Sequence, residues 1–318
     1  MSELDKIESA AALVYGHMRP TAEYCWPLLC ERAGTEVWVK HENHTPIGAF
    51  KVRGGLVFMD DLKRLRPDVA GVITATRGNH GQSIAYAARA HGLKAVVVVP
   101  HGNSVEKNRA MRALGAELIE HGEDFNAAHD HARQRASRDD LYMVPSFDPL
   151  LARGVATYSL EFLRGAPELD VVYVPIGLGS GIAGMITARD ALGCGTKVVG
   201  VVSERAAAYA LSFEAGRPIA TNSADTMADG VAVRIPDPTA LEIILRGAER
   251  IVTVSENEIK AAMRAYYTDT HNLAEGAGAA PLAALLKEKD KLTGKRVGII
   301  LSGGNVDASV FRAVLAES

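Results

Sequence analysis

One lysine of the sequence stands where a covalent nucleophile could act. Lys51 follows the aromatic residue Phe50 and precedes Val52, Arg53 and two glycines, in a segment that enters a predicted helix. A lysine amine attacks a carbonyl group only when it is deprotonated, which requires burial or a neighbouring cation. The apolar, glycine-rich surroundings favour burial of Lys51, and Arg53 could supply the cation. On this segment alone, a solvated surface lysine is an equally good interpretation.

A second segment, Thr76-Arg77-Gly78-Asn79-His80-Gly81-Gln82, lies between a predicted strand and a predicted helix. Backbone N–H groups at a helix N-terminus readily bind a carboxylate. The Asn79 side chain both donates and accepts hydrogen bonds, which suits a phenolic or carbonyl oxygen. The simpler alternative is a turn in which Gly78 and Gly81 have positive φ angles and Asn79 caps the helix.

A third segment, Pro175-Ile176-Gly177-Leu178-Gly179-Ser180-Gly181-Ile182-Ala183-Gly184, also joins a strand to a helix. Glycines let backbone N–H groups approach a phosphate, and the helix N-terminus adds a partial positive charge. A dinucleotide site fits less well, because the third glycine of its Gly-x-Gly-x-x-Gly pattern falls on Ile182. No Gly-Lys-Ser/Thr of a nucleotide-binding P-loop follows. The segment therefore favours a single phosphate monoester.

The fourth segment, Leu301-Ser302-Gly303-Gly304-Asn305, follows the last predicted strand. The Ser302 hydroxyl could hydrogen-bond an unprotonated ring nitrogen without carrying charge. In isolation, a serine that caps the next helix is the alternative interpretation. Together, an amine, an anion-binding turn, a phosphate loop and a neutral hydroxyl are what pyridoxal 5′-phosphate requires.

The elements that must position these segments are alternating strands and helices. Several predicted strands are continuously apolar, which is typical of parallel strands covered on both faces. Such alternation predicts an α/β fold, in which ligands bind beyond the carboxyl ends of the strands. The predicted strands are 36–41, 71–76, 94–99, 117–119, 141–144, 171–176, 197–202 and 296–301, and the predicted helices include 82–90 and 104–114.

Charge and composition argue against several other classes of protein. The 35 Lys and Arg residues nearly balance 38 Asp and Glu, so a dedicated nucleic-acid-binding function is not expected. Apolar runs such as Ala95 to Pro100 are far shorter than the roughly 18 residues of a membrane span. The acidic N-terminus does not match a secretory signal, and Cys25, Cys30 and Cys194 show no metal-binding spacing. We therefore expect a reduced, cytoplasmic protein.

In their order along the chain, the four segments resemble motifs of the fold-type II pyridoxal-phosphate enzymes, and within them the threonine/serine dehydratase and serine racemase group. Ala228-Asp229-Gly230-Val231 and Glu275-Gly276-Ala277-Gly278 belong to the same resemblance, which covers nearly the whole chain. It implies a two-domain, tryptophan synthase beta-like α/β architecture with parallel-rich sheets flanked by helices. It also implies a homodimer. Residues 1–66 and 149–318 would form the large cofactor-binding domain and residues 67–148 the small one, with the active site in the cleft between them.

The resemblance assigns roles to residues of each segment. Lys51 would form the internal Schiff base and then remove the Cα proton, with Phe50 against the cofactor ring. Asn79 would hydrogen-bond the phenolate oxygen, and Ser302 would face the pyridine nitrogen. The other implied contacts are the backbone amides of Gly177, Leu178, Gly179, Ser180 and Gly181 with the phosphate, and Thr76, Asn79 and His80 with the substrate carboxylate.

The implied activity is that of a dehydratase, or ammonia-lyase. A serine at the pyridine nitrogen leaves the ring a weaker electron sink, which favours prompt loss of a β-substituent. The amino-acid substrate would be threonine, serine, 3-hydroxyaspartate, a β-aryl serine or a related catabolic compound, and the products a 2-oxo acid and ammonia. The alternatives are an amino-acid (serine) racemase, a β-replacement synthase and a non-catalytic pyridoxal-phosphate-binding homologue.

Three features depart from the group. Its serine racemases have a serine where this chain has Arg77, which cannot act as a base at neutral pH, so racemisation is less favoured. Arg77 could instead contact the substrate carboxylate or side chain, pair with an acid, or point to solvent. Val202 and Ala208 occupy the positions of two metal-binding carboxylates, with Glu204 nearby, so we expect no metal. Only 13 residues follow Asn305, so we expect no C-terminal regulatory domain of the kind found in some biosynthetic threonine dehydratases.

Overall fold

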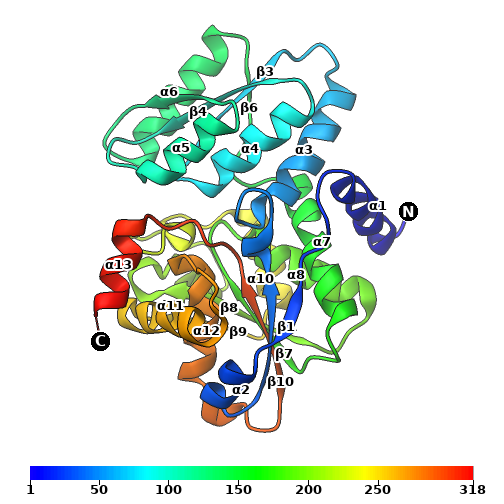
Figure 1. Ribbon diagram of the computed structural model, residues 1–318. Helices are drawn as coiled ribbons and strands as arrows, with labels where there is room; N and C mark the ends of the chain where they lie inside the picture. Colours follow the sequence, from blue (N-terminus) through cyan, green and yellow to red (C-terminus); the bar gives the residue numbers. More distant parts are fainter. Residues whose placement is uncertain (318) are drawn as a thin grey trace.

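Two separate β-sheets organise the computed structural model, which describes residues 1–317. The large sheet has the strand order β1-β2-β10-β7-β8-β9 and the small sheet the order β5-β4-β3-β6. Among the strand pairs of residues 1–317, only the edge pair β1–β2 is antiparallel, so the expected parallel-rich α/β fold is confirmed. In Figure 1 the small sheet lies at the top and the large sheet below it. The strands are β1 (Glu23–Cys25), β2 (Glu36–His41), β3 (Gly71–Ala75), β4 (Lys94–Val99), β5 (Glu117–Glu120), β6 (Tyr142–Met143), β7 (Val171–Pro175), β8 (Lys197–Ser203), β9 (Arg250–Val254) and β10 (Arg296–Leu301).

Helices cover both sheets, and many begin and end with the residues that helix termini prefer. Ser104 caps α5 by accepting a hydrogen bond from the Lys107 backbone, and Gly115 follows that helix with a φ of 95°. The α-helices are α1 (Glu3–Tyr15), α2 (Pro27–Ala33), α3 (Lys51–Leu65), α4 (Asn79–Ala90), α5 (Val105–Ala113), α6 (Phe125–Arg138), α7 (Pro149–Gly165), α8 (Ser180–Leu192), α9 (Ala208–Ala215), α10 (Pro238–Gly247), α11 (Glu256–Thr270), α12 (Gly276–Lys287) and α13 (Ala308–Ala316). The 3₁₀ helices are η1 (Glu42–His44), η2 (Glu204–Ala206), η3 (Asp229–Val231) and η4 (Lys289–Lys291).

The large sheet is buried on both faces, and alternate residues of its strands face opposite layers. In β7, Val171 and Tyr173 share a core with α2, α11 and α12. Val172 and Val174 share a second core with α7, α8, α9 and α10. This two-sided burial explains why the central strands read as continuous apolar runs in the sequence.

The small sheet is covered in the same way. Val72 and Val97 pack with apolar side chains of α3 and α4, whereas Ile73 and Val96 pack against α6. All four strands of this sheet lie between residues 71 and 143. Helix α3 precedes them in sequence but shares their core, so it links the two sheets. The division into domains at residues 66 and 149 stays a prediction.

Two strands are absent from the sequence prediction. β1 is a three-residue edge strand whose side chains remain largely accessible, so it lacks an apolar run. β9 also lies at a sheet edge, and only Val252 and Val254 of its residues are buried. Helix α4 begins at Asn79 rather than at the expected Gln82. No helix within residues 1–317 is long and apolar enough to cross a membrane.

Candidate active site

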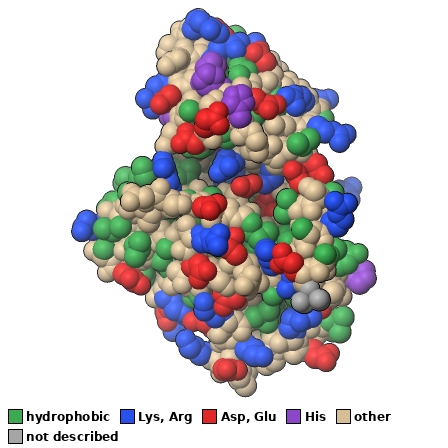
Figure 2. All heavy atoms as spheres, turned by 90° about the vertical axis from the view of Figure 1, so that its left-hand side faces the viewer, with side chains coloured by type: hydrophobic (Ala, Val, Ile, Leu, Met, Phe, Trp, Pro, Cys, Tyr) green, Lys and Arg blue, Asp and Glu red, His purple; other side chains and the backbone are tan. Residues whose placement is uncertain are grey.

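A cavity of about 540 Å³ lies between the segments that follow β3 and β7. Six of the expected site residues line it: Lys51, Thr76, Arg77, Asn79, His80 and Leu178. Six others do not line it: Phe50 precedes the lining residue Lys51, the residues Gly177, Gly179, Ser180 and Gly181 flank the lining residue Leu178, and Ser302 follows β10. In Figure 2 the molecule narrows between its upper and lower parts, and charged side chains of both signs lie at this waist.

Lys51 is the first residue of α3 and opens into this cavity. Burial lowers the pKa of its amine from the usual 10.5 to about 8, against the opposing charge of Glu275. The Lys51 Nζ atom lies 5.0 Å from the centre of the Phe50 ring. That ring in turn meets Tyr158 edge-on, with 5.9 Å between the ring centres. The amine is therefore held in a largely apolar setting where an appreciable fraction is deprotonated near neutral pH.

Arg53 does not assist Lys51, so the expectation that it supplies a neighbouring cation is wrong. Its fully buried guanidinium donates to Glu42 at 2.7 Å and to Glu161 at 2.6 Å. Residues two positions apart on a helix point to nearly opposite sides, which carries Arg53 away from the Lys51 amine. This buried network instead ties the first turn of α3 to η1 and α7.

The turn after β3 is built around Thr76. Its hydroxyl accepts hydrogen bonds from the Gly78 and Gly81 backbone N–H groups, at 2.9 and 3.3 Å. Gly78 has an extended φ of 161° and Gly81 lies inside α4, so neither has the positive φ of the alternative turn. Asn79 does not cap α4. That alternative is therefore wrong, and the α4 N-terminus faces the cavity.

The Asn79 side chain has hydrogen-bond partners in the protein, whereas one ring nitrogen of His80 has none among residues 1–317. Asn79 donates to Glu275 at 2.6 Å and accepts from Asn305 at 2.9 Å. The buried His80 Nε2 atom has no hydrogen-bond partner among residues 1–317. Burial and then the charge of Lys51 lower the pKa of His80 to about 3, so its imidazole is neutral. An orphaned buried ring nitrogen marks a place where a bound molecule could supply the missing contact.

The loop between β7 and α8 has the geometry of an anion cradle. Gly179 precedes α8 with a φ of 102°, and no side chain caps the helix. A Cβ at Gly177 would overlap the Gly230 carbonyl oxygen, and one at Gly179 would lie 2.6 Å from the Ala240 Cβ. The Tyr209 hydroxyl donates to the Leu178 carbonyl oxygen at 2.8 Å and fixes the loop. The first N–H groups of α8 are left for an external anion.

Ser302 directly follows β10 and is buried. Its carbonyl oxygen accepts a 3.0 Å hydrogen bond from the Phe50 N–H, and Gly303 bridges Ala49. These bonds place Ser302 next to the residue that precedes Lys51. The next helix, α13, begins only at Ala308, so the helix-cap alternative for Ser302 is wrong.

Comparison with known proteins identifies the family that shares this arrangement. The family model described as pyridoxal-phosphate dependent enzyme matches residues 15–303. The chain belongs to the pyridoxal-phosphate dependent enzymes. It is 32% identical to the L-threonine ammonia-lyase of Thermotoga maritima over 319 residues, which cover 99% of this chain and 78% of that protein. Its fold matches a threonine deaminase isoform 2 from Solanum lycopersicum with a TM-score of 0.92, 31% identity and coverage of 99% and 93% of the two chains. It also matches maize serine racemase, with a TM-score of 0.92, 25% identity and coverage of 99% and 97%.

These matches confirm the expected fold-type II group and its cofactor, and the residues present in this pyridoxal-phosphate enzyme fit that cofactor. Lys51 offers an amine of lowered pKa, and the uncapped α8 offers N–H groups for a phosphate. The unpartnered nitrogen of His80, which lines the cavity, leaves a hydrogen bond for a bound molecule to complete. Ser302 provides a neutral hydroxyl at the same edge of the large sheet as the N-terminus of α8.

Three charged residues of this enzyme were not assigned a role from the sequence. The Lys107 Nζ atom lies 3.4 Å from Asp229 and 3.5 Å from Glu275. Although burial opposes it, the two carboxylates raise the pKa of Lys107, whereas burial raises the pKa of Glu275. The only sequence signal was that Asp229 and Glu275 fall within the two further family segments. Nothing marked Lys107 apart from its place in a predicted helix.

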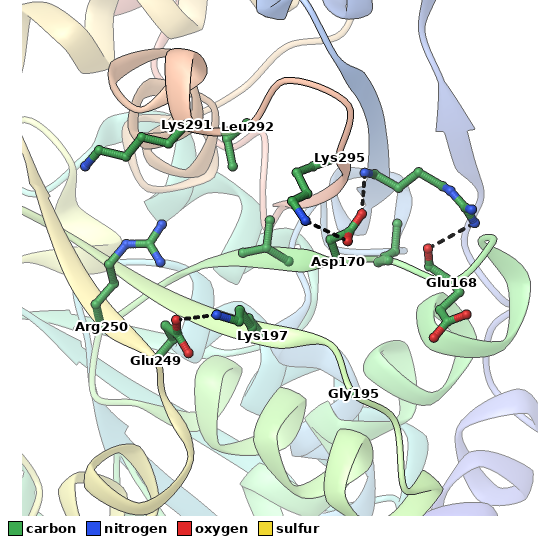
Figure 3. A pocket seen from close by; sticks show the side chains of 12 residues that line it. Glu168, Asp170, Gly195, Lys197, Glu249, Arg250, Lys291, Leu292 and Lys295 are labelled. Carbon is green, nitrogen blue, oxygen red and sulfur yellow. Dashed lines mark hydrogen bonds and ion pairs between the residues drawn. The ribbon is translucent and has the colours of Figure 1, made fainter.

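A second cavity, of about 580 Å³, lies at the opposite edge of the large sheet (Figure 3). It is lined by the first residues of β7, β8, β9 and β10, whereas ligands of such sheets bind beyond the carboxyl ends. Its cations are held by neighbouring acids. Lys197 pairs with Glu249 at 2.7 Å, and Lys295 with Asp170 at 3.4 Å. None of the expected site residues lines this cavity.

Proposed function

We propose that this enzyme is a dehydratase, or ammonia-lyase, of β-hydroxy-α-amino acids. The proposal rests on one observation: the Lys51 amine, whose pKa is about 8, lines the same cavity as the N-terminus of α4. The similarity to threonine ammonia-lyase and threonine deaminase supports elimination as the reaction. Threonine and serine are the first substrates to test.

The loops bordering the cavity would hold the cofactor. Lys51 would bind it covalently with Phe50 beside its ring, and Asn79 and Ser302 would hydrogen-bond its oxygen and its ring nitrogen. The backbone of residues 177–181 would bind its phosphate. When bound, pyridoxal phosphate supplies a conjugated ring that delocalises the electron pair left at the substrate Cα.

The residues around the cavity would perform the remaining steps. The α4 N-terminus and the Thr76 turn would bind the substrate carboxylate and leave the amino group directed at Lys51. The Lys51 amine would take the Cα proton, because it is the cavity group whose pKa suits both the loss and the gain of a proton. In its protonated form it would return a proton to the departing β-hydroxyl. Loss of water leaves an enamine, which hydrolyses to a 2-oxo acid and ammonia.

A panel of β-hydroxy amino acids tests this proposal. Purified enzyme loaded with pyridoxal phosphate should release ammonia and a 2-oxo acid in equal amounts from at least one member. Lys51→Ala should abolish release, and Lys63→Ala, at a half-buried position near the other end of the same helix and outside the cavity lining, should not. Absence of both products across the panel would refute the proposal.

A racemase is the second candidate, supported by the fold similarity to maize serine racemase. A racemase needs a proton donor on the far side of Cα. Arg77 lines the cavity where those racemases have a serine, and its guanidinium does not lose a proton at neutral pH. Chiral analysis of unconsumed L-serine would detect this activity as an accumulating D-isomer.

We also propose, from the resemblance to fold-type II enzymes, a cytoplasmic homodimer with domains at 1–66 plus 149–318 and 67–148. Sedimentation equilibrium would show the dimer as twice the 33.8 kDa chain mass. The prediction that activity needs no metal is tested by adding a chelator, which should leave the rate unchanged.

A further inference from the structure

Two guanidinium groups line the active-site cavity without an acidic partner. Arg77 is exposed and follows β3, and Arg234 is half-buried and lies between η3 and α10. Neither side chain forms a hydrogen bond or an ion pair with any other residue in the described range 1–317. In the second cavity, by contrast, Lys197 and Lys295 each have a carboxylate partner.

The acids that line the cavity are already engaged. Asp229 pairs with Lys107, and Asp124 caps α6 by accepting a hydrogen bond from the Ala127 backbone at 2.9 Å. Lys107 also has Glu275 as a partner. In the holoenzyme the Lys51 nitrogen would be committed to the cofactor and so would not be available to a substrate side chain. Arg77 and Arg234 are therefore the two positive charges of the cavity left unmatched.

The two arginines come from different parts of the fold. Arg77 belongs to the Thr76–His80 turn beside the small sheet. Arg234 belongs to the segment beyond η3, where its carbonyl oxygen accepts a 2.9 Å hydrogen bond from the Thr221 N–H. The neighbouring lining residues Asn222 and Ser223 are neutral. An anion between the two segments would therefore meet guanidinium groups and uncharged polar side chains.

We propose that the cavity selects a β-hydroxy-α-amino acid that carries a second carboxylate, such as 3-hydroxyaspartate, and that Arg77 and Arg234 bind this carboxylate. This inference rests on the proposed function. Three anionic groups then have three separate cationic or dipolar partners: the cofactor phosphate meets the α8 N-terminus, the substrate α-carboxylate meets the α4 N-terminus, and the side-chain carboxylate meets the two arginines. The planar guanidinium is the side chain best suited to pairing with a carboxylate.

Binding measurements on the holoenzyme test the inference independently of turnover. Succinate and butyrate each have four carbons, but only succinate has two carboxylates. Calorimetric titration should show succinate binding at least 10-fold more tightly than butyrate. Arg77→Gln and Arg234→Gln should each reduce succinate affinity about 10-fold and leave butyrate affinity within 3-fold. Arg217→Gln is the matched control, because Arg217 is exposed and lies outside the cavity lining.

Steady-state kinetics provides the second arm. The kcat/KM for 3-hydroxyaspartate should exceed that for serine and threonine, and each of the two cavity variants should lower the ratio of the 3-hydroxyaspartate value to the serine value at least 10-fold. Equal affinity for succinate and butyrate, or variants that affect all substrates alike, would overturn the inference and leave the proposed function standing. If no β-hydroxy amino acid is eliminated but succinate is still selected through both arginines, the proposed function fails and the dicarboxylate preference stands.

Discussion

The Asn79 side-chain amide donates a 2.6 Å hydrogen bond to Glu275, which lies 196 positions further along the chain. The same amide accepts a 2.9 Å hydrogen bond from Asn305. These two bonds fix which end of the amide is nitrogen and leave its second N–H free to donate. A residue at the start of α4 is thereby tied to the residue that precedes α12, across the junction of the two sheets.

Replacing Asn79 should weaken cofactor binding. Asn79→Asp puts a second carboxylate within hydrogen-bond distance of Glu275 and removes the free N–H donor. We expect pyridoxal-phosphate affinity to fall at least 10-fold, measured by equilibrium dialysis of the apoenzyme. Asn126→Asp, at another position of the cavity lining, is the control and should leave affinity within 3-fold. Equal affinity in the wild type and Asn79→Asp would show that Asn79 makes no contact with the cofactor.

The lowered pKa of Lys51 predicts how cofactor attachment depends on pH. Only the neutral amine attacks an aldehyde, so the attachment rate should rise with pH up to about 8 and then level off. Stopped-flow absorbance of apoenzyme mixed with pyridoxal phosphate between pH 6 and 10 measures this rate. A rate that kept rising to pH 10, as for a free lysine, would contradict the assignment.

The same pKa predicts a change in stability of the apoenzyme. Because the pKa is lower in the folded state, the unfolded chain binds the proton more tightly, and the free energy of unfolding rises as the pH increases from about 8 to 10.5. Lys51→Met should therefore stabilise the apoenzyme by up to about 3 kcal/mol at pH 7, with the difference shrinking towards pH 10. Urea unfolding at the two pH values measures it. A stabilisation that did not depend on pH would point to packing alone.

The phosphate cradle depends on the backbone of Gly179. Gly179→Ala forces a φ of 102° on a residue with a Cβ and brings that Cβ to 2.6 Å from Ala240. We expect a loss of roughly 1–3 kcal/mol in stability together with a loss of cofactor affinity. Gly193→Ala, at the other end of α8 with a φ of 66° and open space around it, should affect stability alone. Fluorescence titration with pyridoxal phosphate measures the cofactor affinity, which should fall in Gly179→Ala and stay unchanged in Gly193→Ala.

The buried network around Arg53 should be a major contributor to stability. Arg53→Met leaves Glu42 buried without a cation and leaves Glu161 with Lys40 alone, and breaking such a buried pair typically costs about 3–5 kcal/mol. Arg164→Met, which breaks the exposed pair with Glu8, is the control and should cost less than about 1 kcal/mol. Urea unfolding of the two variants measures the difference. A cost below 1 kcal/mol for Arg53→Met would show that the carboxylates find other partners.

The sequence predicted the features that depend on local patterns. The central strands were recognisable because both of their faces are buried, and the loops after β3, β7 and β10 were recognisable because glycines follow apolar runs. The loops after β7 and β10 lie at one edge of the large sheet because its central strands are parallel, whereas the loop after β3 belongs to the small sheet. The four segments were therefore found without knowledge of any contact between them.

Features that depend on how the two sheets sit together could not be predicted in this way. The Lys107–Asp229 pair joins residues 122 positions apart, and no local pattern links them. The unpaired state of Arg77 and Arg234 likewise emerges only when every neighbouring acid has been assigned a partner. By contrast, the sequence could have predicted where Arg53 points, because helical periodicity alone directs its side chain away from Lys51.

The most direct test of the account is to locate the cofactor on the chain. Holoenzyme treated with borohydride, which makes the bond between lysine and pyridoxal phosphate permanent, is digested and its peptides are weighed by mass spectrometry. The account expects the added mass on the peptide that contains Lys51, and none on that peptide in the Lys51→Ala variant. Modification of Lys107 or of any other lysine in place of Lys51 would contradict it.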